Sequence, residues 1–170
     1  NEHINPNGAW YRPLSMMSFW LNYQAVGEMS SFAFKGVNIL LHLLMGILLY
    51  LLSYRLSVHW FATVASSRRH VTALIVTAFW LLHPIHVSTV LYTIQRMTQL
   101  SALFSLLACL HYLTWRNKPQ SDLSALGHMV GTGLLVICAY FSKEVGAMTF
   151  VLLMLIEGYC FKQTPLGPQL

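Results

Sequence analysis

Long apolar runs separated by short polar stretches dominate the chain. Each run stays apolar on every face of a helix, whereas a helix on the surface of a soluble domain has one polar face. The runs are also too long, and too rich in leucine and alanine, to be strands. A helix of roughly 20 residues crosses the hydrocarbon core of a bilayer. Five segments approach this length: 36–54, 71–87, 98–115, 123–141 and 145–161.

This pattern predicts an all-α fold, a polytopic transmembrane helix bundle of about five spans. The second and fifth segments are near the short limit, so their ends are the least defined. The more polar residues before the first segment predict an outer loop segment with short helices over 1–35. A transmembrane helical domain over 36–161 and a cytoplasmic tail over 162–170 complete the predicted organisation.

The composition agrees with a membrane protein. Hydrophobic residues make up 56% of the chain, charged residues 9%, and the mean hydropathy is +0.56. A soluble domain usually carries about 25% charged residues. The net charge of +5 is typical of basic cytoplasmic loops, and no basic run with interleaved aromatics indicates a nucleic-acid partner. Three cysteines in apolar surroundings are expected to be free thiols.

The basic residues predict an orientation in the membrane. If the first span runs toward the cytoplasm, six basic residues fall on the cytoplasmic side and four on the outer side. The inner six cluster in polar stretches such as SSRRH and WRNKPQS. The outer four are single and have mainly apolar or aromatic neighbours: Arg12, Lys35, Arg96 and Lys143. We therefore expect an integral membrane protein with isolated cations on its outer side.

With alternating spans, three separate stretches meet on that outer side: the amino-terminal segment, the loop 83–98 and the stretch 142–144. Ionisable groups at membrane depth cost about 2.5–3.5 kcal/mol on insertion scales, so they usually face a cavity or a partner. Arg96 and Lys143 are expected to form a cationic pocket at the lipid–water boundary, with Glu144 pairing with either. Such a pocket suits the phosphate of an anionic headgroup. The structural alternative for a single arginine near a helix end is snorkelling to the headgroups.

The outer loop begins with the sequence HPIH. Pro84 is expected to end a helix and to set a re-entrant turn. His83 and His86 form a weak metal signal with no third ligand nearby, so no metal site is predicted and hydrogen bonding at the interface is favoured. Three further histidines lie within the apolar segments and are expected to hydrogen-bond across the bundle: His42, His111 and His128.

Three blocks of the sequence carry a resemblance. In chain order they read YRPLSMMSFWLNYQ with VNILLHLLMGILLYLL, then FWLLHPIHVSTVLYTIQRMTQLSALFSLLACLHYL, then FSKEVGAMTFVLLMLIEGYCF. The chain resembles bacterial integral-membrane proteins with carboxy-terminal tetratricopeptide repeats. Those are similar to the transmembrane and tetratricopeptide-repeat O-mannosyltransferases of eukaryotes. Both resemble the wider class of polyprenyl-phosphate-sugar-dependent glycosyltransferases with the GT-C fold.

The resemblance implies part of an enzyme of a bacterial inner membrane. It would move a sugar from a polyprenyl-phosphate donor to a protein or glycan acceptor on the periplasmic side. The family's first span, the acidic loop after it and the repeats are not expected in this chain, so the catalytic base is expected upstream of Asn1. The resemblance implies no certain cofactor, and it leaves any need for a divalent metal open. The donor-side residues that it carries over are Arg12, His83, His86, Gln95, Arg96, Lys143 and Glu144.

Physical reasoning supports the same chemistry. When a sugar–phosphate bond breaks, negative charge grows on the leaving phosphate, and fixed cations such as Arg96 and Lys143 would stabilise it. Two other classes stand beside this hypothesis. One is a non-catalytic membrane scaffold or assembly module, and the other is a haem or quinone subunit built on the histidines. Charges at the span ends rather than at the midplane argue against a transporter.

Overall fold

Helices form all the regular structure that is described for this chain. The structure, a computed structural model, describes residues 12–27, 30–60, 63–117 and 122–161. Short 3-10 helices, η2 (Thr93–Gln95) and η3 (Glu144–Ala147), precede the fifth and the seventh α-helix. The predicted all-α fold class is confirmed over the described ranges. The α-helices are α1 (Pro13–Val26), α2 (Ser31–Trp60), α3 (Ser66–Leu81), α4 (His86–Leu91), α5 (Arg96–Arg116), α6 (Asp122–Ser142) and α7 (Met148–Cys160).

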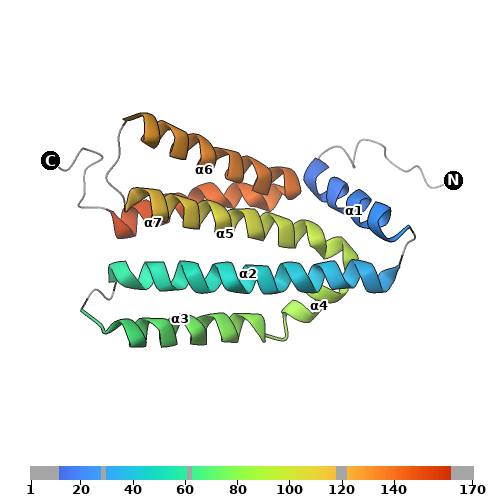
Figure 1. The fold of residues 1–170 in the computed structure, drawn as a ribbon, viewed down its shortest axis with the longest axis horizontal. Coiled ribbons are helices and arrows are strands. Elements are labelled where there is room, and N and C mark those ends of the chain that lie inside the picture. Colours follow the sequence, from blue (N-terminus) through green and yellow to red (C-terminus); the bar gives the residue numbers. More distant parts are fainter. Residues whose placement is uncertain (1–11, 28–29, 61–62, 118–121, 162–170) are drawn as a thin grey trace.

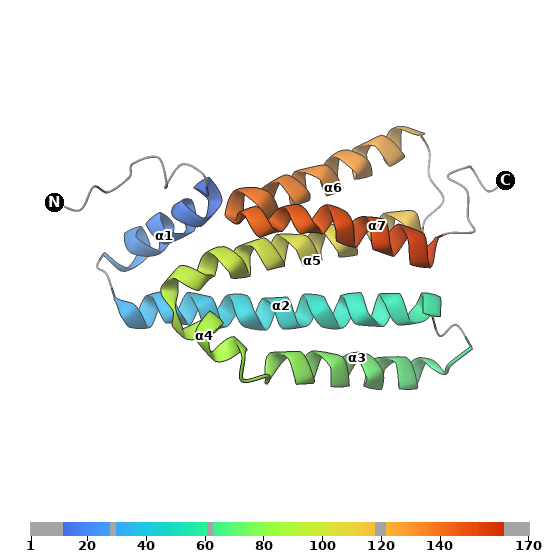
Figure 2. The same ribbon diagram turned by 180° about the vertical axis from the view of Figure 1, so that it is seen from behind.

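The long helices lie side by side in a flat bundle. In Figures 1 and 2, α2 packs against α3 on one side and against α5 on the other, and α5 packs against α6 and α7. The short helices α1 and α4 lie at one end of the bundle, together with the starts of α2, α5 and α7 and the end of α6. We call this the α1 end. It gathers all three stretches that the sequence predicts to share one face.

Among the described residues, three helical segments have the length and composition to cross a membrane: Ser31–His59, Thr93–Arg116 and Leu123–Ser142. The helix α3 has 16 residues and α7 has 13, so for these two segments the predicted span stays a prediction. Large apolar side chains cover the outside of the bundle, and Phe32, Leu82 and Leu123 are 82–87% exposed. Such a surface is costly in water, whereas lipid tails cover it without penalty.

The second apolar segment, predicted as 71–87, is divided between two helices. The helix α3 ends at Leu81, and α4 begins at His86 after a turn through Pro84. A proline disfavours helical backbone at the residue before it, which explains the break at His83. The expected helix end at Pro84 is thus confirmed, and the chain turns here toward α5 instead of continuing along α2.

The interior of the bundle changes character along its length. Away from the α1 end, an apolar core cluster joins Leu52 of α2 to Cys109 and Leu113 of α5. At the α1 end, the largest fully buried side chains are polar instead, among them Asn38, Arg96 and Gln99. Buried polar groups are stable only when they are hydrogen-bonded, so this end of the bundle requires a specific network.

Candidate functional site

Side-chain contacts join the three predicted stretches at the α1 end. The guanidinium of Arg12, just before α1, donates from Nε and Nη2 to both carboxylate oxygens of Glu144, at 3.0 and 2.9 Å. The Lys143 ammonium donates to the Thr98 hydroxyl at 2.7 Å. These contacts connect residues that are 132 and 45 positions apart in the chain. The predicted meeting of the amino-terminal segment, the loop 83–98 and the stretch 142–144 is therefore observed.

Arg96 lies inside the protein and not on an open surface. Its side chain is 0% exposed. Its guanidinium donates to Oδ1 of Asn38 at 3.0 Å and to Oδ1 of Asn22 at 2.8 Å. It also donates to the backbone oxygens of Phe34, at 2.8 Å, and Ser18, at 3.3 Å. The rings of Phe34 and Phe19 flank the charge, with centroids 5.2 and 4.8 Å from Cζ.

These partners make Arg96 the centre of a three-helix junction. Asn22 belongs to α1, Asn38 to α2, and Arg96 is the first residue of α5. Every partner is a neutral oxygen or an aromatic ring, and no carboxylate among the described residues pairs with this charge. The geometry corrects the expectation of an open pocket shared by Arg96 and Lys143. Four of the five N–H donors of this guanidinium bond groups inside the protein, and the residue is fully buried, so Arg96 has a structural role at the junction.

The ion pair of Arg12 and Glu144 is more open than Arg96. Its two side chains are 33% and 52% exposed. The pKa of Glu144 lies below its usual range because its own backbone N–H and then the Arg12 guanidinium hydrogen-bond the carboxylate. Glu144 was expected to pair with Arg96 or Lys143, but its partner is Arg12. This pair fastens the start of α1 to the turn before α7.

The backbone around Lys143 fixes where its side chain begins. The helix α6 ends at Ser142, and Lys143 is extended, with φ −162° and ψ 145°. Gly146 then packs directly onto α6, because a Cβ atom at this position would lie 2.2 Å from the carbonyl carbon of Ala139. The backbone oxygen of Ser142 accepts a 2.7 Å hydrogen bond from Ser15 of α1. The Lys143 side chain, half-buried, therefore extends from a tightly packed turn toward the start of α5.

Thr98 is the residue of this site that sequence reasoning missed. Its hydroxyl accepts from Lys143 and donates to Oε1 of Gln95 at 2.9 Å. The signal was present in the QRMT sequence, because residues three apart on a helix are neighbours. Gln95, Thr98 and Lys143 thus form a continuous hydrogen-bonded group, while Arg96 points the other way into the α1–α2 junction.

His83 and His86 lie at the corner between α3 and α4. His83 is exposed, and its Nδ1 accepts a 3.2 Å hydrogen bond from the backbone N–H of Ile85. The His86 ring lies 4.4 Å from the Trp80 ring and 5.3 Å from the His42 ring, measured between centroids. None of the contacts described for these two histidines reaches Arg12, Lys143 or Glu144. Among the described residues, no group of three or more His, Cys, Asp or Glu side chains could hold a metal ion.

The histidines inside the apolar segments bond across the bundle as predicted. His42 of α2 contacts the backbone oxygen of Leu81 through Nε2 at 3.1 Å. His111 of α5 contacts the Thr132 hydroxyl of α6 at 3.0 Å and Nδ1 of His128 at 3.3 Å. These contacts are the interhelical hydrogen bonds that the sequence predicts for the three histidines.

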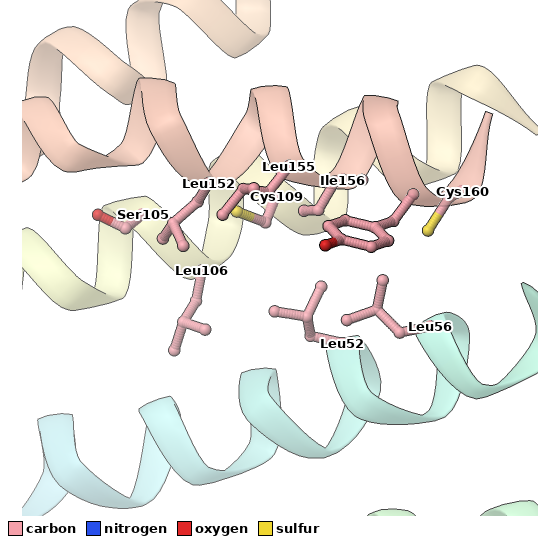
Figure 3. Close-up of a pocket in the computed structure, with 10 residues that line it drawn as sticks. Leu52, Leu56, Ser105, Leu106, Cys109, Leu152, Leu155, Ile156 and Cys160 are labelled. Carbon is pink, nitrogen blue, oxygen red and sulfur yellow. The ribbon is translucent and has the colours of Figure 1, made fainter. Parts of the chain in front are cut away.

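The half of the bundle away from the α1 end holds an apolar cavity of about 410 Å³. Figure 3 shows side chains of α2, α5 and α7 around it, including Leu52, Leu106 and Leu152. Beyond it, Glu157 of α7 accepts hydrogen bonds from Tyr112 and Arg116 of α5. These hydrogen bonds satisfy the Glu157 carboxylate within the bundle. The residues that line the cavity are mainly apolar, and none of them is charged.

Comparison with known proteins gives two distant relatives. The chain is 30% identical over 161 residues to protein O-mannosyl-transferase Tmtc1 of Drosophila melanogaster. The aligned residues make up 95% of this chain and 16% of that protein. It is 28% identical over 148 residues to protein O-mannosyl-transferase F38B6.6 of Caenorhabditis elegans. In this case the aligned residues make up 86% of this chain and 19% of that protein. No protein-family model and no solved structure matches. The chain thus spans less than a fifth of the length of these relatives, and it is similar to part of the protein O-mannosyl-transferases.

Proposed function

We propose that this chain is part of a membrane glycosyltransferase with a partial GT-C-like core. It takes a sugar from a polyprenyl-phosphate donor and passes it to a protein or glycan acceptor on the periplasmic side of a bacterial inner membrane. The names of the two relatives support the transferase class. Three apolar helices of spanning length support the membrane setting. The single observation that carries the proposal is the half-buried ammonium of Lys143 at the α1 end, where the three stretches meet.

The charges at this end favour an anionic ligand. Among the described residues that form the contacts of the site, three are basic, Arg12, Arg96 and Lys143, and one is acidic, Glu144. An excess of positive charge next to a low-dielectric interior raises the local concentration of anions. A lipid phosphate also brings its own apolar chain, which the surrounding bilayer can hold. A lipid-linked sugar phosphate satisfies both conditions.

We assign Lys143 the direct contact with the donor phosphate. As the sugar leaves, negative charge grows on the phosphate oxygens, and a fixed ammonium close to them lowers the barrier. Gln95 is the second group placed to hydrogen-bond the phosphate. Arg96 supports the site from inside by holding α1 and α2 against α5. Arg12 and Glu144 lie at the more exposed edge of the site, where each compensates the other's charge.

His83 and His86 take a different place in the proposal. They belong to the α3–α4 corner at the same end, where an exposed imidazole can hydrogen-bond a sugar or an acceptor hydroxyl. Neither is assigned to the phosphate. The general base that activates the acceptor hydroxyl is not assigned to any residue of this chain.

The test uses the full-length protein in membranes and follows the loss of a radiolabelled polyprenyl-phosphate sugar. Replacing Lys143 with Ala is expected to lower kcat about 100-fold, the usual cost of losing one group that stabilises transition-state charge. The matched control is Lys35→Ala, which removes the same charge from an exposed position of α2 at the same end. Its rate is expected to stay near that of the wild type.

Two outcomes would count against the proposal. Equal rates for Lys143→Ala and Lys35→Ala would show that Lys143 does not contact the donor. Absence of turnover by the wild type, in membranes that contain correctly inserted protein, would favour the scaffold or assembly module. In that case the buried network around Arg96 would be the main role of these polar residues.

A further inference from the structure

The hydrogen bonds of Thr98 determine how its neighbours are oriented. Its hydroxyl carries one proton and two lone pairs. Lysine is only a donor, so the 2.7 Å contact with Lys143 uses a lone pair of Thr98. The hydroxyl proton is then available for Oε1 of Gln95, at 2.9 Å. Because the amide oxygen faces Thr98, the amide N–H₂ group of Gln95 is directed away from the threonine.

The position of Thr98 is itself rigid. It lies in the first turn of α5, and Arg96, Met97 and Gln99 around it are 4% exposed or less. Gln99 donates to the backbone oxygen of Asn38 at 3.1 Å, and Arg96 holds the junction with α1 and α2. A side chain on such a turn has little freedom to move. The first turn of α5 also carries the positive end of the dipole of a 21-residue helix.

We propose that Thr98 is the positioning residue of a phosphate site. Its hydroxyl holds the Lys143 ammonium and the Gln95 amide in one fixed arrangement, so that both present N–H donors to the oxygens of a phosphate monoester or diester. The inference rests on the proposed function, because it names the donor set for the phosphate of the lipid-linked sugar. Two of the three ammonium protons of Lys143 remain for the ligand after the bond to Thr98.

The arrangement explains why a threonine, and not an apolar residue, occupies this position. Without the hydroxyl, the Lys143 chain regains its rotamer freedom, and the Gln95 amide can turn its oxygen toward the anion. An amide oxygen next to a phosphate is repulsive. Loss of the Thr98 hydroxyl therefore weakens binding of the charged headgroup and leaves binding of an uncharged lipid chain unchanged.

The experiment measures lipid binding by the full-length protein in lipid nanodiscs. The probes are polyprenyl monophosphate, the corresponding polyprenol without phosphate, and inorganic phosphate as a competitor. The variants are Thr98→Val, which keeps the shape and removes the hydroxyl, and Thr98→Ser, which keeps the hydroxyl. The matched control is Thr72→Val on α3, whose hydroxyl bonds only its own helix, at the Arg68 oxygen, in the described structure.

Wild-type protein is expected to bind polyprenyl monophosphate more tightly than polyprenol. We expect Thr98→Val to weaken binding of the phosphate about tenfold, as for loss of a charge-assisted hydrogen bond, with polyprenol binding unchanged. Thr98→Ser and Thr72→Val should stay close to the wild type. Displacement of the lipid by inorganic phosphate would show that a free phosphate also fits. Failure to displace it would restrict the site to lipid-linked phosphates, and both results agree with the proposal.

Two results would overturn this inference. One is a Thr98→Val variant that retains the full preference for phosphate, and the other is a Thr98→Ser variant that loses as much of it as Thr98→Val. The binding measurement requires no sugar transfer, so it separates the two proposals. If the protein transfers the sugar but its preference for polyprenyl monophosphate over polyprenol does not depend on Thr98, only the positioning role is refuted. If the preference depends on Thr98 but the protein transfers no sugar, the phosphate site is supported and the transferase function is refuted.

Discussion

Replacing Arg96 with Met separates a structural arginine from a ligand-binding one. Methionine keeps the apolar stem of the side chain, to about the position of Nε, but removes the guanidinium and all its donors. The amide oxygens of Asn22 and Asn38 and the backbone oxygen of Phe34 would then lose a partner in a buried region. Each buried acceptor left unpaired costs about 1–3 kcal/mol, and the flanking cation–π contacts are lost as well. Partial relaxation reduces the sum, so we expect a loss of about 3–5 kcal/mol in the free energy of unfolding.

The assay is a denaturation titration of the full-length protein in mixed micelles, with Arg68→Met as the control. Arg68 is an exposed arginine of α3, so its replacement should change the free energy of unfolding by less than about 0.5 kcal/mol. A double-mutant cycle with Asn22→Leu tests the contact itself. Once the arginine is gone, replacing Asn22 removes an unpaired group, so the two losses should be non-additive by about 1–3 kcal/mol.

If Arg96→Met unfolds like Arg68→Met but no longer binds polyprenyl monophosphate, Arg96 contacts the ligand and is not a structural residue. An additive double-mutant cycle would show that the bond to Asn22 contributes nothing to stability.

Two further predictions follow from the turn before α7. Gly146→Ala should destabilise the protein by about 1–3 kcal/mol in the same titration, because its Cβ would meet the backbone of Ala139 at 2.2 Å. The control is Gly133→Ala, whose Cβ would have no atom within 4 Å, so it should be neutral or slightly stabilising. A destabilised Gly133→Ala would contradict this account. Because the pKa of Glu144 is lowered by folding, its contribution to stability is present at neutral pH and is lost as the pH falls through that lowered pKa. Thermal melting of Glu144→Gln against pH should show less acid-side loss than the wild type, and identical acid-side curves would exclude the pair with Arg12 as a contributor.

The case of Arg96 and Lys143 shows how far sequence reasoning reaches. In the sequence both are single cations at the end of an apolar run, and although Glu144 follows Lys143, the local pattern does not show which of the two cations is buried. Their separate roles depend on which side of α5 each faces and on what has packed there. Asn38 and Asn22, the partners of Arg96, lie 58 and 74 positions away along the chain. Pairing at that range depends on helix packing, which one-dimensional patterns do not contain.

Thr98, His83 and His86 give the opposite lesson about residue types. Histidines attract functional interpretation, but the described contacts of these two lie at the α3–α4 corner and with His42 of the adjacent helix α2. Threonine attracts none, although Thr98 connects two of the predicted ligand-binding residues. Hydroxyl groups are common, and their importance depends on the two groups that lie within hydrogen-bonding distance. Only the tertiary structure supplies that information.

The sequence by itself determined the helical class and the approximate positions of the apolar segments, because continuous apolar stretches can satisfy their backbone in lipid only as helices. It also determined the break at Pro84 and the meeting of three polar stretches at one end, since alternating spans return the chain to the same side. The tertiary structure alone decided which cation is buried, which is paired with Glu144, and which lies beside Thr98 and Gln95. Those choices depend on contacts between distant helices, where the desolvation of each charge is compensated by particular partners.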